Sequence, residues 1–237
     1  MTNYRIETAK DPQDLARKAS EFIAIQISLA LEQRDRCQIA LSGGSTPGRA
    51  YTRLSQEHLP WDRVDVLLGD ERWVAAEDES SNALMLRRTL LHEGPGSAAV
   101  FHAVPTVELE NADASASAFA DLISRVCSGE PPIFDLMLLG LGDDGHTASL
   151  FPGTDAPKVV DSWCTVGRGK GLDRITLTAP VLSAARQVMF LVSGASKRQA
   201  LQRLIDPSED PERTPAKLVQ PAAEILILAD QDAASGL

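Results

Sequence analysis

Six short apolar runs, separated by segments with helical periodicity, constrain this chain more than any other feature. Each run is continuously apolar rather than alternating, which is typical of strands that are covered on both faces in a parallel sheet. The runs are Cys37–Leu41, Val64–Leu68, Ile133–Leu139, Ile175–Thr178, Val188–Val192 and Ile225–Leu228.

Helical patterns lie between these runs. Asp11 and Pro12 read as an N-cap followed by a first-turn proline, and apolar residues recur at helical spacing from Leu15 to Leu31. Further helices are expected over Ser81–Leu91, Asn111–Cys127 and Ser196–Ile205. This alternation predicts an α/β fold: a mainly parallel, open, doubly wound sheet of Rossmann-like type, with helices on both faces.

The length of 237 residues suits one domain with a substantial core, and we treat residues 1–237 as a single catalytic domain. The one compositional break is the acidic, proline-rich stretch "DPSEDPERTP" at residues 206–215. We interpret this stretch as a surface excursion rather than a domain boundary, with an active-site lid as the alternative.

Composition excludes several classes of protein. The net charge of −10 argues against nucleic-acid or anionic-membrane partners, because both require a basic surface. The three cysteines, Cys37, Cys127 and Cys164, are widely spaced, which favours buried free thiols in a reducing compartment. The N-terminus lacks an apolar signal segment, and no apolar run approaches the ~20 residues that span a bilayer. We therefore expect a cytoplasmic protein.

Ligands of open α/β sheets bind beyond the carboxyl ends of the strands. Four of the expected strands end in glycine together with polar or charged residues: "SGGSTPG", "GDERW", "GLGDDGH" and "SGASKR". These four segments are expected to form one composite site.

The first segment contains Gly43, Gly44, Ser45 and Thr46. Two glycines allow close backbone approach, and N–H groups at a helix start attract an anion such as phosphate. The alternative is a tight strand-to-helix turn in which Thr46 is only the N-cap.

Four side chains in the second and fourth segments could bind an anion or orient a group that does. Arg72 offers a planar fork for phosphate or carboxylate, and Asp70 could act as a base or orient Arg72. Lys197 is expected in a first helical turn, where a cation is unfavourable unless an anion lies beside it, and Arg198 could replace it. The alternative for these residues is an exposed surface position.

The third segment places Asp143, Asp144 and His146 on a glycine-rich bend. Histidine is the side chain most easily set as a base near neutral pH. A structural histidine is the alternative, but the acids, the glycines and the strand end favour catalysis. The other histidines show no spacing typical of metal ligands, so no metal site is expected.

Together these motifs resemble the 6-phosphogluconolactonase family. The matching segments include "LSGGSTP", "GDERWV", "FDLMLLGLGDDGHTASLFPGT", "RITLTAPVLSAARQVMFLVSGASKRQAL" and "TPAKLVQP", in the order of the family and over nearly the whole chain. The resemblance implies hydrolysis of 6-phospho-D-glucono-1,5-lactone in the oxidative pentose phosphate pathway, without metal or organic cofactor. It implies no partner besides the sugar phosphate lactone, and we expect a monomer or weak homo-oligomer.

The resemblance also implies roles for individual residues. His146 would deprotonate the attacking water, and Asp144, in preference to Asp143, would hold its imidazole. Arg72 and Lys197 would bind the phosphate, with Arg174 as a further candidate. The resemblance adds the following groups: Gly43, Gly44, Ser45 and Thr46 beside the phosphate, and Asp70 on Arg72 or on sugar hydroxyls.

Two alternatives remain. The related glucosamine-6-phosphate deaminase/isomerase pattern has a glutamate where this chain has Phe151 and a tyrosine where it has Arg72, so both positions favour lactone hydrolysis. A non-catalytic sugar-phosphate sensor is the second alternative. Such sensors usually carry a separate DNA-binding segment, whereas this sequence starts directly on the α/β pattern.

Overall fold

The fold is built on a seven-stranded sheet in which every neighbouring pair is parallel, as seen in a computed structural model that describes residues 2–237. The strand order is β1-β10-β9-β6-β2-β3-β5. The strands are β1 (Tyr4–Ala9), β2 (Cys37–Leu41), β3 (Val64–Leu68), β5 (Val100–Phe101), β6 (Leu136–Gly140), β9 (Val188–Val192) and β10 (Ile225–Asp230). The predicted open, mainly parallel sheet is therefore confirmed.

The bounds of β2, β3 and β9 match the predicted runs, whereas β6 begins at Leu136 rather than at Ile133. Ile133 instead forms an isolated antiparallel bridge with Ser128, so the start of the apolar run closes a local turn. Two strands of the main sheet were not predicted: β1 has no continuous apolar run, and β5 has only two residues.

The prediction that Ile175–Thr178 is a strand of the parallel sheet was wrong about which strands it pairs with. This run lies in β8 (Leu172–Leu177), which joins β4 (Asp70–Arg72) and β7 (Cys164–Gly169) in a separate antiparallel sheet of order β4-β8-β7. Lys170 and Gly171 connect β7 to β8 with φ of 55° and 81°, which is the backbone of a two-residue hairpin turn. A hairpin makes the two strands antiparallel, and apolar content alone does not reveal this.

The helices follow the predicted signals closely. The Asp11 side chain accepts a hydrogen bond from Asp14 N (2.8 Å), and the side chains of Ser81 and Asn111 cap the next two predicted helices in the same way. The helices are α1 (Pro12–Gln33), α2 (Ser45–Leu54), α3 (Asn82–Thr89), α4 (Ala112–Val126), α5 (Ala179–Ala184), α6 (Arg198–Ile205) and α7 (Gln231–Ala234).

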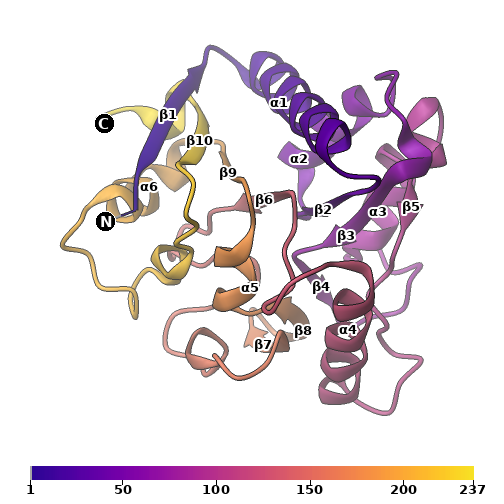
Figure 1. The fold of residues 1–237 in the computed structure, drawn as a ribbon. Helices are drawn as coiled ribbons and strands as arrows, with labels where there is room; N and C mark the ends of the chain where they lie inside the picture. The colour runs from indigo at the N-terminus through magenta and orange to yellow at the C-terminus, as the bar shows by residue number, and fades with distance from the viewer. Residues whose placement is uncertain (1) are drawn as a thin grey trace.

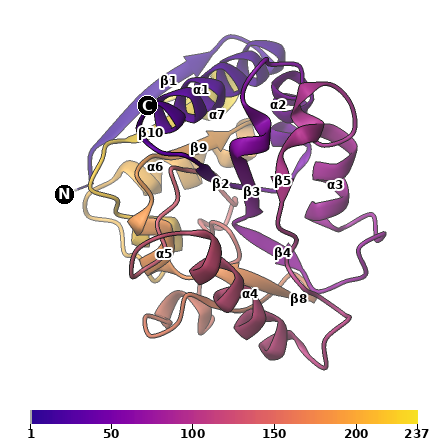
Figure 2. The same cartoon turned by 45° about the vertical axis from the view of Figure 1, so that its right-hand side comes forward.

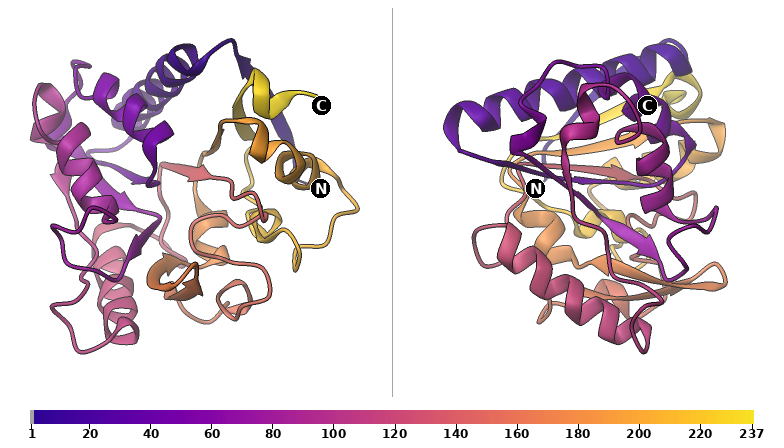
Figure 3. Two further views of the ribbon diagram at one scale, coloured as in Figure 1. Left: turned by 180° about the vertical axis from the view of Figure 1, so that it is seen from behind. Right: turned by 90° about the vertical axis from the view of Figure 1, so that its right-hand side faces the viewer.

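The elements form layers around the main sheet. Helix α1 runs over one face, and the small antiparallel sheet lies on the other face together with α4 and α5 (Figure 1). Figure 2 shows α4 beside the small sheet, and the right-hand view of Figure 3 shows α1 and α4 on opposite sides of the main sheet. The C-terminus lies near β1, the strand with which the described part of the chain begins (Figure 1).

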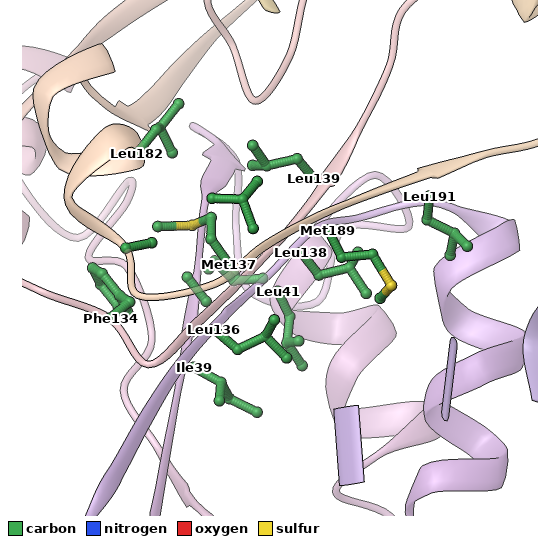
Figure 4. Close-up of a cluster of buried hydrophobic side chains, with 14 of the residues drawn as sticks. Ile39, Leu41, Phe134, Leu136, Met137, Leu138, Leu139, Leu182, Met189 and Leu191 are labelled. Carbon is green, nitrogen blue, oxygen red and sulfur yellow. The ribbon is translucent and has the colours of Figure 1, made fainter. Parts of the chain in front are cut away.

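The apolar core fills the space around the central strands (Figure 4). Ile39 and Leu41 of β2 lie beside the leucine-rich β6, which lies in turn beside Met189 and Leu191 of β9, and all are buried. The three cysteines are also buried and unlinked, as predicted. Within residues 2–237, no helix has the length and apolar character needed to cross a membrane.

The carboxylate of Glu71 joins β4 to the start of α3. It accepts hydrogen bonds from the backbone N–H groups of Arg72 (2.8 Å), Asn82 (2.8 Å) and Ala83 (2.7 Å), and from the Ser81 hydroxyl (3.2 Å). Glu71 is 2% exposed, so these donors have no water to replace it. One buried side chain thus fixes the segment that carries Asp70 and Arg72.

We expect Glu71→Ala to destabilise the protein by about 2–4 kcal/mol, because it leaves several buried N–H groups without an acceptor. The exposed Glu77 of the same connection is the matched control, and Glu77→Ala should change stability by less than about 0.5 kcal/mol. Chemical denaturation of both variants measures the difference, and equal effects would contradict the role of Glu71.

Candidate functional site

A cleft of about 220 Å³ opens at the carboxyl edge of the main sheet, between β2 and β6. Strand order reverses there, since β3 and β5 continue on one side of β2 while β6, β9 and β10 lie on the other. This is the place where open α/β sheets bind ligands. The polar lining side chains are Ser42, Asp70, Arg72, Asn82, His146, Lys170, Arg174 and Lys197.

His146 and Asp144 form a hydrogen-bonded pair at this cleft. His146 Nδ1 lies 2.5 Å from Asp144 Oδ1, and the same carboxylate oxygen accepts the His146 backbone N–H at 3.1 Å. A carboxylate can only accept, so Nδ1 carries the proton and Nε2 keeps its lone pair. The His146 side chain is 16% exposed and lines the cleft, so its Nε2 lone pair can accept a proton there.

Burial and the partner have opposite effects on this imidazole. Burial lowers the pKa of His146, and the hydrogen bond and charge of Asp144 raise it only in part, so the pKa lies below its ordinary value. Burial raises the pKa of Asp144, but the hydrogen bonds from His146 outweigh this effect and hold that pKa below its ordinary value. The pair is therefore a neutral imidazole beside a carboxylate at neutral pH.

The turn that carries this pair has no room for a side chain at residue 142. A Cβ on Gly142 would lie 2.0 Å from His146 Nδ1 and 2.5 Å from Asp144 Oδ1. The turn is closed by Gly142 N, which donates to His146 O at 2.8 Å. The neighbouring acid Asp143 is exposed and lies 3.8 Å from Lys170 Nζ, so Asp144 is the acid that the structure places on the histidine.

Arg72 and Arg174 lie directly opposite each other on β4 and β8. Like charges in such a pair repel, unless an anion lies between or beside them. Arg72 donates through Nη1 to the Ser80 carbonyl, and the buried Nε atoms of both arginines have no protein partner among residues 2–237. Burial lowers the pKa of Arg174 although Asp70 opposes this shift. Two cations paired in this way can bind an anion.

Asp70 is anchored beside the arginines. Its Oδ2 accepts the Ser149 hydroxyl at 2.6 Å and lies 3.8 Å from Arg174 Nη1. The prediction that Asp70 orients Arg72 rested on their proximity in sequence. In the structure, Asp70 contacts Arg174 instead. Lys197 lines the same cleft from the β9 side.

The glycine-rich segment is divided between two cavities. Gly43 lines the cleft, whereas Gly44 and Ser45 line an adjacent cavity of about 430 Å³ that also touches Arg72. Thr46 lies inside α2 and lines neither cavity, so neither of its expected roles is supported, since Gly44 occupies the N-cap position.

The start of α6 also differs from its prediction. Lys197 ends a 3₁₀ turn (Ala195–Lys197), and α6 begins at Arg198. Arg198 donates to the Asp232 carbonyl at 3.1 Å and does not line the cleft, so it does not replace Lys197.

Three cleft residues were missed by sequence reasoning: Ser42, Asn82 and Lys170. Ser42 directly precedes the glycine pair, and its buried hydroxyl has no protein partner in the described chain. Lys170 reaches the cleft from the hairpin turn, and the flanking glycines of "GKG" were the available signal. Asn82 follows the cap residue Ser81 and gave no signal. Across residues 2–237, no three His, Cys, Asp or Glu side chains are grouped to hold a metal ion.

Comparison with known proteins places these residues in context. The profile of the family described as glucosamine-6-phosphate isomerases/6-phosphogluconolactonase matches residues 10–228. The chain is 40% identical to a 6-phosphogluconolactonase of Synechocystis over 235 residues, which covers 98% of each chain.

Solved structures show the same likeness. A 6-phosphogluconolactonase from Trypanosoma brucei superposes with a TM-score of 0.88 at 29% identity, with full coverage of both chains. A monomeric glucosamine-6-phosphate deaminase superposes with a TM-score of 0.82 at 19% identity, covering 98% of this chain and 99% of the other, and shares the fold.

We expect Asp144→Asn to lower the pKa of His146 further, because the charge and hydrogen bond of this carboxylate raise it. NMR titration of the imidazole measures the shift. Asp143→Asn is the matched control and should leave the His146 titration nearly unchanged. A larger shift in the Asp143 variant would overturn the pairing of Asp144 with His146.

Proposed function

Because the chain belongs to the glucosamine-6-phosphate isomerase/6-phosphogluconolactonase family, we propose that it hydrolyses 6-phospho-D-glucono-1,5-lactone to 6-phospho-D-gluconate. The observation that carries this proposal is the juxtaposition of a neutral base and an anion site in one cleft. A lactone that bears a phosphate at its far end needs both. The reaction belongs to the oxidative pentose phosphate pathway.

The base is His146. Its Nε2 takes a proton from a water molecule, and the resulting hydroxide attacks the C1 carbonyl of the lactone. The imidazolium, stabilised by Asp144, then returns the proton to the ring oxygen as the ester bond breaks. Both steps need only one side chain that titrates near neutrality, and the lowered pKa keeps it in the basic form.

The phosphate is held by Arg72, Arg174 and Lys197. Guanidinium groups bind phosphate through several charge-assisted hydrogen bonds, and the buried Nε atoms of Arg72 and Arg174 have no competing acceptor in the described part of the chain. An anion would also relieve the repulsion between the paired arginines. Phosphate binding thereby orients the carbonyl toward His146.

The required acceleration is modest, since the lactone is a reactive ester that opens unaided. A positioned base contributes on the order of 10²–10⁴ in rate, and orientation by the anchored phosphate adds to this. No covalent nucleophile is needed. The buried hydroxyl of Ser42 is available to donate a hydrogen bond to the substrate.

Deaminase chemistry is less well supported. The position that carries a glutamate in the deaminase-like pattern is Phe151, which is 4% exposed and packs against His146. An aromatic ring there cannot exchange protons with the histidine.

We further propose that the protein acts in the cytoplasm as a monomer or weak homo-oligomer.

We expect His146→Asn to lower turnover by on the order of 10²–10⁴ while leaving product binding nearly intact. Proton release from freshly prepared lactone measures the rate, with an enzyme-free blank because the lactone opens by itself. Wild-type activity should be lost as the pH falls through the lowered pKa of His146, because protonation removes the base. Binding of 6-phosphogluconate without turnover by the wild type would instead support a sugar-phosphate sensor.

We expect Arg72→Ala to raise KM for the phosphorylated lactone by about 10- to 100-fold, because it removes charge-assisted hydrogen bonds. Arg198→Ala is the matched control, since Arg198 faces Asp232 rather than the cleft, and its KM should stay at the wild-type value. An unchanged KM in the Arg72 variant would remove this residue from the phosphate site.

A further inference from the structure

The ring of Phe151 lies beside both His146 and Arg174. Its centroid is 4.6 Å from that of the His146 ring, with an angle of 43° between the two planes. The guanidinium carbon of Arg174 lies 5.4 Å from the same Phe151 centroid. One aromatic ring therefore contacts both the imidazole and the guanidinium that the proposed reaction uses.

Strand β7 of the β7–β8 hairpin accommodates this ring at a glycine. A Cβ on Gly169 would lie 2.5 Å from Phe151 Cδ2, so only glycine admits the ring at that point of β7. Two residues earlier, a Cβ on Gly167 would lie 2.3 Å from the Ser149 carbonyl oxygen. Residues two apart share a face of a strand, so the segment Ser149–Phe151 lies across a face without side chains.

The two contacts differ in kind and complement each other. The guanidinium of Arg174 is attracted by the face of the ring, and this attraction strengthens where water is excluded. The imidazole of His146 packs on the ring with its Nδ1 held by Asp144, so the histidine cannot turn without breaking either contact. The separation between imidazole and guanidinium can be no larger than the sum of the two centroid distances.

We propose that Phe151 is a positioning residue that sets the distance between the base and the phosphate-binding arginine, and so makes the site prefer phosphorylated over unphosphorylated lactones. The carbonyl and the phosphate of the substrate lie at opposite ends of one six-carbon skeleton. A fixed spacing between His146 and Arg174 therefore converts phosphate binding into alignment of the carbonyl. This inference rests on the proposed lactone hydrolysis.

The decisive comparison is between 6-phosphoglucono-1,5-lactone and glucono-1,5-lactone as substrates of Phe151→Leu. We expect the ratio of their kcat/KM values to fall about tenfold, mainly through the phosphorylated substrate, because the ring contact with Arg174 is lost. Phe151→Tyr keeps the ring and should restore most of the preference. Phe134→Leu makes the same substitution at a core position and should leave the ratio unchanged.

An unchanged ratio in a folded Phe151→Leu protein would overturn the proposal, and so would an equal loss in Phe134→Leu. If the leucine variant does not fold, Phe151→Met removes the ring with an unbranched side chain and carries the same expectation. If the wild type hydrolyses neither lactone above the blank, the proposed function fails and calorimetry with 6-phosphogluconate decides the inference. Affinity should then be about tenfold weaker in Phe151→Leu than in Phe134→Leu, and equal affinities would overturn it.

Discussion

Parallel pairing of β2 with both β3 and β6 is the constraint on which the rest of the structure depends. After β2 the chain continues to β3 on one side of β2, and it later returns to the other side of β2 at β6. The carboxyl ends of β2 and β6 therefore meet at a gap that no crossover helix fills among the described residues. The Ser42–Gly43 turn and the His146 turn start at this gap. Segments that are about 100 residues apart thereby face one cleft.

Those parts of the site that follow directly from strand ends could be predicted from sequence. The continuous apolar runs of β3, β6 and β9 identify where each strand stops, and Asp70, His146 and Lys197 follow those strand ends. Lys170 could not be found in this way, because it depends on the β7–β8 hairpin folding back over the sheet. The same hairpin explains why the predicted parallel partners of Ile175–Thr178 were wrong, since apolar content does not distinguish a parallel neighbour from an antiparallel one.

The proline-rich excursion at residues 206–215 shows a further limit of composition. Most of it is exposed, as predicted, but Thr214 at its end is buried against Gly145. Ala216 N donates to the Gly145 carbonyl at 3.0 Å, so the excursion returns onto the turn that holds the base. A stretch whose composition predicts an exposed loop thus supports the backbone of the turn that carries His146. Composition does not reveal this role, because it depends on a long-range contact.

The pairing of β1 with β10 determines when the main sheet can be completed during folding. Tyr4 lies opposite Ile225, so the first strand waits for a neighbour that is made about 220 residues later. At ~5–20 residues per second, synthesis of that interval takes roughly 10–40 s. Once β9 is made, its edge also lacks a partner until β10 follows, because β10 lies between β9 and β1. Completion of the sheet is therefore a late event, and loss of β10 would leave β1 and β9 without their shared neighbour.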